Sequence, residues 1–164
     1  MMRRLPGSLL LVLLLLPMQL FALPSDSKQP IAVEADSLEV RDQENISIYQ
    51  GNVSLTQGSL EISSQRLVIY FNEARELVLM EMTGAPARFR LLDNDRRELR
   101  GRAEKINYSV SKSLLELLGN ARFSHSGDSI EGSEIRVNTE TNSIQAGRPD
   151  SDERVKMLIQ PKTE

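Results

Sequence analysis

The sequence predicts an all-β protein made of stacked antiparallel layers, and three observations support this prediction. Apolar residues alternate with polar ones in many short segments, and turn-forming residues separate these segments roughly every 8–12 positions. The two halves of the chain also align without a gap when one is shifted by 68 positions, which places Gly51-Asn52 on Gly119-Asn120. Half-buried strands at this spacing are typical of antiparallel sheets rather than of βαβ units.

A shorter pattern recurs inside each half: an apolar residue, any residue, a small residue, two of any kind, and an apolar residue. It occurs at Val33–Leu38, Ile62–Leu67 and Ile130–Ile135, and at Gly101–Ile106 with glycine in the first place. A unit repeated in this way cannot bury its apolar face alone, so neighbouring units must stack into one core. The sequence therefore predicts two 68-residue repeats that share a core.

Residues 1–22 are predicted to be a secretory signal peptide. Arg3 and Arg4 form a basic start, residues 9–16 are an aliphatic run, and Ala22 offers a small residue at a cleavage point. The alternative is a retained membrane anchor, but spanning a bilayer takes about 20 apolar residues, and Pro17 follows this run. We therefore expect an exported protein whose mature chain starts at Leu23 with a flexible segment over residues 23–29.

The mature chain contains several segments with the period of two that is typical of strands. They are residues 31–35, 46–48, 53–55, 60–62, 67–69, 89–91, 106–110 and 135–137. Turn-forming residues lie between them, at 42–45, 51–52, 57–59, 72–73, 93–95, 126–128 and 141–142.

Two further segments have compositions that also suit a helix. Glu73–Met82 is rich in helix formers, and Ser111–Leu118 is rich in leucine. The second segment aligns with Asn45–Gln50 in the repeat, where Ile48 and Tyr49 indicate a strand. We predict strands for both, because local propensity is a weak prior that a neighbouring layer overrides.

The two Gly-Asn pairs are predicted to be structural. Each follows one apolar segment and precedes another, and glycine accepts a positive φ without penalty, which suits a tight hairpin or a corner in a rolled sheet. The small residues of the short pattern are expected where adjacent layers approach closely. They are Ala35, Ser64, Ala103 and Gly132.

Residues 147–164 are predicted to form a polar loop and a terminal edge strand with a short tail. Residues 147–153 are rich in turn formers, and Val155, Met157 and Ile159 then alternate with polar residues before Pro161. A terminal strand has unpaired N–H and C=O groups on one side, and such an edge must be blunted, covered or used.

The composition excludes some classes of function. The chain has no cysteine, so an exported domain of this kind must rely on ladder hydrogen bonds and an apolar core instead of disulfides. Its net charge of −3 becomes more negative once Arg3 and Arg4 are removed. A mildly acidic chain without a basic run is not predicted to bind nucleic acid. We expect one domain, over residues 30–146.

No catalytic constellation is recognisable in the sequence. There is no cysteine nucleophile, no Gly-x-Ser-x-Gly elbow and no glycine-rich phosphate loop. The acidic residues are scattered, so no metal site is predicted. His125, the single histidine, lies beside a Ser-Gly-Asp turn and is interpreted as a surface residue. We therefore expect neither an enzyme nor a cofactor.

The apolar interior remains as the candidate functional surface. If the layers are splayed, they form a groove that is lined by Ile31, Val33, Leu67, Ile69, Phe89, Tyr108 and Val110. Alternation of apolar and polar residues is the same for a filled core and for an open groove, so both interpretations stand at this point.

Five segments in order resemble the OstA-like family of lipopolysaccharide-export proteins. They are residues 30–40 (PIAVEADSLEV), 49–58 (YQGNVSLTQG), 84–89 (GAPARF), 101–108 (with Gly101, Ala103, Ile106 and Tyr108) and 119–121 (GNA). The resemblance covers roughly residues 30–160. It implies an antiparallel β-jellyroll that is open at both ends.

The resemblance also implies a role and a location. Proteins of this family carry lipopolysaccharide across the periplasm, with the acyl chains inside the roll and the sugars outside. The positions that match the lipid-contacting interior of the family are Ile31, Val33, Phe89, Tyr108 and Val110.

Stacking of subunits end to end is a further implication of the resemblance. The first edge strand, with Ile31 and Val33, is expected to pair with the last one of another copy, with Val155, Met157 and Ile159. The expected neighbours at the two ends of such a stack are an LptC-like inner-membrane protein and the N-terminal domain of an LptD-like outer-membrane barrel.

Two alternatives belong to other classes. The protein is a membrane-anchored homologue of the same fold if residues 9–16 are not cleaved off, or it is a structural β-repeat protein with a filled core and no lipid cargo.

Overall fold

The computed structural model describes residues 29–93, 95–141, 143–148 and 152–161. These residues form ten β-strands and one short 3-10 helix, all in one sheet apart from the helix. The elements are β1 (Ala32–Glu34), β2 (Ser37–Arg41), η2 (Asp42–Glu44), β3 (Ile46–Gln57), β4 (Leu60–Phe71), β5 (Leu77–Leu92), β6 (Glu98–Ser109), β7 (Leu114–His125), β8 (Asp128–Asn138), β9 (Ser143–Ala146) and β10 (Lys156–Leu158).

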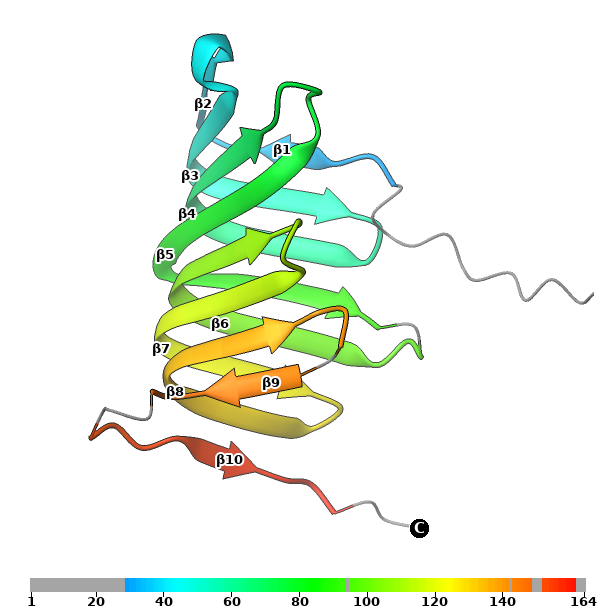
Figure 1. Cartoon of the computed structure of the whole chain (residues 1–164), viewed down its shortest axis with the longest axis vertical. Coiled ribbons are helices and arrows are strands. Elements are labelled where there is room, and N and C mark those ends of the chain that lie inside the picture. Colours follow the sequence, from blue (N-terminus) through cyan, green and yellow to red (C-terminus); the bar gives the residue numbers. More distant parts are fainter. Residues whose placement is uncertain (1–28, 94, 142, 149–151, 162–164) are drawn as a thin grey trace, which may run out of the picture.

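The six long strands β3 to β8 form an antiparallel meander in which each strand pairs with the next along the chain. At one end β1 and β2 pair with different halves of β3, and at the other end β10 and β9 pair with different halves of β8. In Figure 1 the strands follow one another along the long axis of the molecule, from β1 and β2 near the top to β10 at the bottom. Among the described strands, neither end of the sheet closes on the other.

A shift of register interrupts every ladder between the long strands near its middle. The shifts fall between Gln50 and Val53 on β3, between Ser63 and Arg66 on β4, and at matching places along β5, β6 and β7. Bulges of this kind bend a strand, and the strands in Figure 1 turn sharply at one side of the molecule. Each long strand therefore contributes to two limbs of the sheet: limb 1 also contains β1 and β10, and limb 2 contains β2 and β9.

The Gly-Asn pairs form two of these corners. Gly51 and Gly119 have φ of 81° and 78°, and the Asn that follows each has φ of 46°. The Asn52 side chain donates a hydrogen bond to Asp36 Oδ2 at 2.9 Å, and Asn120 donates in the same way to Glu104. A Cβ on Gly51 would lie 2.2 Å from Asp36 Oδ2, so this corner needs glycine for its φ and for space.

The two limbs bury one apolar cluster between them. It joins residues of limb 1, such as Leu55, Ile62 and Phe123, to residues of limb 2, such as Leu67 and Ile106. Because alternate residues of a strand point to opposite faces, the polar residues between these positions face outward. The molecule is therefore a folded-over sheet with one inner face.

The structure confirms the all-β antiparallel class and corrects the predicted elements in detail. Segments predicted to be separate strands, such as 46–48 with 53–55, are single strands that bend, since the ladder continues beyond the bulge. The predicted segment 31–35 is shorter in the structure, where β1 covers Ala32–Glu34, and the strand predicted over Glu73–Met82 begins only at Leu77. Strand β9 was not predicted.

The repeat of the whole chain and the signal peptide remain predictions. The strands β3 and β7 have the same length and place their Gly-Asn corners 68 positions apart, whereas the repeat of the whole chain stays a prediction. The predicted signal peptide and nearly all of residues 23–29 lie outside the described residues, as does Asn142 of the predicted 141–142 turn. The described part of the chain contains no helix that is long and apolar enough to cross a membrane.

Candidate functional site

The inner face of limb 1 carries a row of mostly apolar residues that crosses the whole sheet from β1 to β10. Neighbouring members of this row are direct cross-strand partners, so their side chains lie next to one another along the long axis. We call it inner row A, and it consists of Val33, Leu55, Ile62, Phe89, Gly101, Phe123, Ile130 and Met157.

Limb 2 carries two further rows that run in the same direction from β2 to β9. Inner row B consists of Leu38, Tyr49, Leu67, Met82, Ile106, Leu117, Ile135 and Ala146. Inner row C consists of Val40, Ser47, Ile69, Met80, Tyr108, Leu115, Val137 and Ile144. Inner row A faces inner rows B and C across the fold, and the three rows form an apolar path along the molecule.

The middle of each row is buried, whereas most of the ends are exposed; the ends Val33 and Ala146 are partly buried. Leu67, Ile106 and Ile135 have no exposed surface, but Met157 is 60% exposed and Leu38 is 55% exposed. The strands that carry these exposed ends have a partner on one side only among the described strands. The apolar path therefore reaches both open edges of the sheet and stops at unpaired backbone.

The seven residues predicted to line a groove divide into three groups. Leu67, Ile69 and Phe89 are buried in the core, and Val33 and Tyr108 are partly buried against it. Ile31 and Val110 are 41% and 38% exposed and lie just outside β1 and β6. The structure therefore places five of the seven in the inner rows, and it fills the space between them with side chains.

The residues predicted for the partner interface lie at the two edges. Val33 is in β1 with Ile31 preceding it, and Met157 is in β10 between Val155 and Ile159. Sequence analysis did not predict Leu38 and Val40 of β2, or Ile144 of β9, which are exposed apolar residues at the same two edges. The alternation of Leu38 and Val40 with polar residues is the signal in the sequence that indicates a strand at the first pair.

Two phenylalanines and a glycine occupy the centre of inner row A. A Cβ built on Gly101 would lie 2.0 Å from Phe89 Cε1, so the Phe89 ring covers the place where a side chain of β6 would stand. The ring centroids of Phe89 and Phe123 are 6.5 Å apart at an interplanar angle of 40°. Phe89 thus spans from its own strand to its aromatic neighbour on β7.

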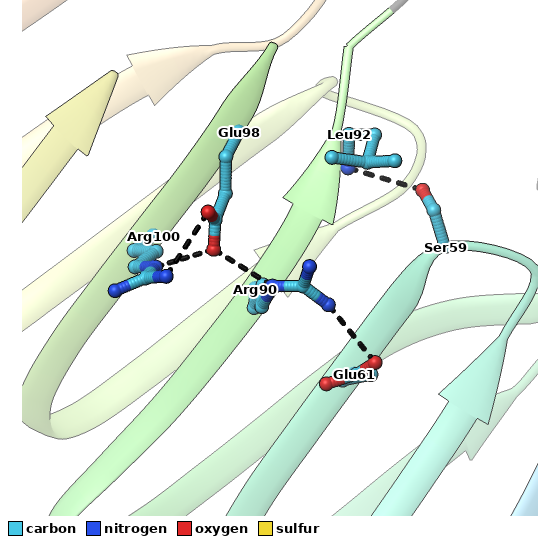
Figure 2. Close-up of polar contacts among 6 residues, drawn as sticks. All are labelled: Ser59, Glu61, Arg90, Leu92, Glu98 and Arg100. Carbon is cyan, nitrogen blue, oxygen red and sulfur yellow. Dashed lines mark hydrogen bonds and ion pairs between the residues drawn. The ribbon is translucent and has the colours of Figure 1, made fainter. Parts of the chain in front are cut away.

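Charged side chains form a network of ion pairs that links β4, β5 and β6 in limb 1. Figure 2 shows Arg90 and Arg100 converging on Glu98, with Arg90 also donating to Glu61 on β4 at 3.0 Å. The Arg90 Nε to Glu98 Oε1 distance is 2.7 Å. Hydrogen bonds from Arg100 and then from Arg90 lower the pKa of the Glu98 carboxyl.

His125 takes part in a turn contact at the end of β7. Its Nε2 lies 2.9 Å from Asp93 Oδ2, and the same carboxyl accepts hydrogen bonds from the backbone and the side chain of Arg97. Partial burial acts to raise the pKa of Asp93, but these hydrogen bonds hold it well below its usual range. His125 is half-buried, and its partner is a structural carboxylate of the neighbouring turn.

In the described ranges, no three His, Asp or Glu side chains are grouped so that they could hold a metal ion. The inner rows offer apolar surface that runs in one direction along the molecule.

Comparison with known proteins gives the same picture. The model of the family described as LptA/(LptD N-terminal domain) LPS transport protein matches residues 32–143. The chain is 30% identical over 148 residues to the "Lipopolysaccharide export system protein LptH" of Pseudomonas aeruginosa, which covers 86% of this chain and 85% of that protein. It is 28% identical over 144 residues to the "Lipopolysaccharide export system protein LptA" of Escherichia coli K12, covering 86% of this chain and 76% of the other.

A solved structure agrees with the folded-over sheet. The crystal structure of LptH, titled the LptA-homologous periplasmic component of the lipopolysaccharide transport device from Pseudomonas aeruginosa, has a TM-score of 0.76 at 28% identity. The match covers 84% of this chain and 100% of the LptH chain. The chain belongs to the LPS transport family that unites LptA with the N-terminal domain of LptD.

Proposed function

We propose that this protein is a periplasmic, non-enzymatic carrier that moves lipopolysaccharide from the inner to the outer membrane. The observation that carries the proposal is the continuity of the three inner rows, which cross the whole sheet and leave exposed apolar residues at both edges, Leu38 and Val40 at one and Ile144 and Met157 at the other. The relatives named lipopolysaccharide export system proteins support the same role.

The mechanism follows from the cost of exposing acyl chains to water. Each exposed CH₂ group costs about 0.8 kcal/mol, so an acyl chain does not cross an aqueous compartment without cover. The inner rows supply apolar contacts of similar chemistry at every strand, so that a chain exchanges one set of contacts for the next as it moves along the long axis. Among the predicted lining residues, Phe89 and Tyr108 are the central contacts of this path.

The path requires that the limbs separate. Leu67, Ile69 and Phe89 are packed in the core, so lipid enters only where the two limbs part. The corners allow this movement in principle, because each limb keeps its own ladder on either side of the register shifts.

End-to-end association extends the path beyond one molecule. Pairing of β1 and β2 of one copy with β10 and β9 of another satisfies the unpaired backbone groups and joins the inner rows. An LptC-like protein and the N-terminal domain of an LptD-like barrel are the proposed neighbours at the two ends. The family model that matches this chain also describes the LptD N-terminal domain, which supports the second of these.

Substitution of inner residues tests this proposal. Replacing Phe89 or Tyr108 by Asp puts a charge in an apolar path, at a cost of several kcal/mol unless the carboxyl is protonated. Lipopolysaccharide co-purification should fall in both variants and should be unchanged in Ser111→Asp, which adds the same charge in the exposed turn that follows β6. Capture at the parental level by folded Phe89→Asp and Tyr108→Asp variants would exclude these side chains from the path.

A second candidate function is that of a structural β protein with a permanently filled core. The complete burial of Leu67, Ile106 and Leu117 favours it. The same lipid-capture experiment separates the two functions, because a permanently filled core predicts no lipid in the parent protein.

A further inference from the structure

The outer face of limb 1 carries a row of arginines beside inner row A. Ser63, Arg88, Arg102, Arg122 and Glu131 are successive cross-strand partners from β4 to β8. Arg88 is adjacent to the buried Phe89 in the chain, so its side chain points to the opposite face of the sheet. Three arginines therefore stand side by side on three neighbouring strands.

These arginines line a hollow of about 660 Å³ on the outer face. Its charged lining is Arg88, Arg90, Arg100, Arg102 and Arg122, against a single acid, Glu61. Four hydroxyl groups complete the polar lining, from Ser54, Thr56, Ser63 and Ser124. This concentration of positive charge occurs in a chain whose net charge is −3.

Only some of the five arginines have an acidic partner. Arg90 and Arg100 bind Glu98, as Figure 2 shows, and Arg122 lies 2.8 Å from Glu131. Within the described part of the chain, Arg88 and Arg102 form no ion pair with an acidic residue. They are direct cross-strand partners on β5 and β6, so their two positive charges lie side by side. Like charges in such a pair destabilise a sheet, so the charges of this pair do not stabilise the fold.

The positive charge extends toward the C-terminal edge. A second hollow of about 580 Å³ shares Arg102 and Arg122 with the first and adds Arg154 and Lys156. Arginine forks bind phosphate oxygens in pairs, and hydroxyl groups hydrogen-bond sugar hydroxyls. Unpaired arginines among hydroxyl groups are therefore suited to an anion that is carried on a sugar.

We propose that the outer hollow, centred on Arg88 and Arg102, binds a phosphorylated saccharide. The sheet of limb 1 separates this hollow from inner row A, so a sugar that carries acyl chains on the inner face does not reach it. The bound saccharide is therefore one without acyl chains in the inner rows, and its binding does not depend on the proposed lipid path.

A titration with an acyl-free probe tests this site. Glucosamine 1-phosphate is titrated into the mature protein and followed by NMR, with glucosamine and inorganic phosphate as comparison ligands. The double variant Arg88→Gln/Arg102→Gln should weaken binding of glucosamine 1-phosphate by about tenfold or more. The matched double variant Arg96→Gln/Lys112→Gln removes the same charge outside both hollows, from side chains that likewise form no ion pair within the described residues, and should bind as the parent does.

A stability measurement accompanies the titration. Because Arg88 and Arg102 repel each other, the melting temperature of their double variant should equal or exceed that of the parent. A lower melting temperature would make the two arginines structural and overturn the proposal.

Three binding results would also overturn it. The first is equal binding of glucosamine 1-phosphate by the two double variants, and the second is binding of inorganic phosphate as tight as that of glucosamine 1-phosphate. The third is displacement of glucosamine 1-phosphate by a polyglutamate peptide that binds more tightly, which would assign the hollow to an acidic protein. Since the probe has no acyl chain, its binding does not depend on the inner rows. Failure of the proposed lipid path is therefore measured separately, by the Phe89→Asp and Tyr108→Asp variants.

Discussion

At the residue scale, the contact between Phe89 and Gly101 defines the centre of the apolar path. The ring fills the space that a side chain on β6 would need, and it approaches Phe123 on the far side of that strand. Any lipid chain that passes along inner row A must displace this ring or slide over it. Gly101 is required here for space, and its backbone conformation is ordinary for a strand.

A substitution at Gly101 tests this contact. Gly101→Ala should lower the free energy of unfolding by about 1–3 kcal/mol, because the new methyl group overlaps the Phe89 ring. Gly132→Ala is the matched control: the nearest atom to its added Cβ is Val155 Cγ2 at 3.6 Å, an ordinary contact. Urea unfolding of both variants measures the difference, and equal midpoints would show that Phe89 moves away at no cost.

The turn around Asp93 gives the protein an acid-sensitive contact. Its folded-state pKa is depressed, so its contribution to stability is complete above the unfolded value of about 4 and is lost as the pH falls below that value. Asp93→Asn should therefore be less stable than the parent at pH 7, and the difference should shrink as the pH is lowered toward 2. Thermal melting across this range measures it, and a difference independent of pH would contradict the assignment.

Single residues were predictable where burial alone decides their position. The alternation of apolar residues placed Leu67, Ile69 and Phe89 inside, and the structure buries all three. The arginine hollow was not predicted, because it depends on the register between β5, β6 and β7. A signal was present, since arginines occupy alternate positions at 88–90 and again at 100–102.

At the scale of elements, the corner of each strand is the main structural device. Short apolar segments on either side of a Gly-Asn pair belong to one strand, and the bulge between them sends the two halves into different limbs. Period-two patterns detect the halves but not their connection, because a bulge adds residues and breaks the alternation. For the same reason, the sequence indicated a hairpin or a corner at Gly51 and did not decide between them.

The short terminal strands form the two free edges of the sheet. Strand β10 pairs with β8 through three residues only, and all three are exposed. Its short ladder contributes little to the fold, whereas its free edge offers backbone groups and the apolar side chains of Met157 and Leu158.

Removal of β10 separates folding from association. Deletion of residues 155–164 should leave a cooperatively melting protein, since β3 to β8 and the buried cluster are retained. It should stay monomeric at concentrations at which the full mature chain forms oligomers. Light scattering on both proteins measures this, and equal oligomerisation would place the joint at another surface.

At the scale of the whole molecule, the structure is one sheet folded over an apolar path that is continuous from edge to edge. The all-β class was predictable from the spacing of the turns, and the open ends followed from the resemblance to the OstA-like family. Whether the interior is filled was not predictable, since a packed core and a lipid groove have the same alternation. The structure shows a packed interior, so the proposed loading with lipid requires the limbs to part.

Site-specific photo-crosslinking in cells tests the central claim, that cargo runs along the inner face, most directly. A photoreactive residue is placed at the inner positions Tyr108 and Leu115 of inner row C, and at their outward neighbours Asn107 and Glu116 on the same strands. The inner positions should crosslink to lipopolysaccharide, and the outward ones should not. Crosslinking at Asn107 and Glu116 with none at Tyr108 and Leu115 would contradict an interior path for the lipid.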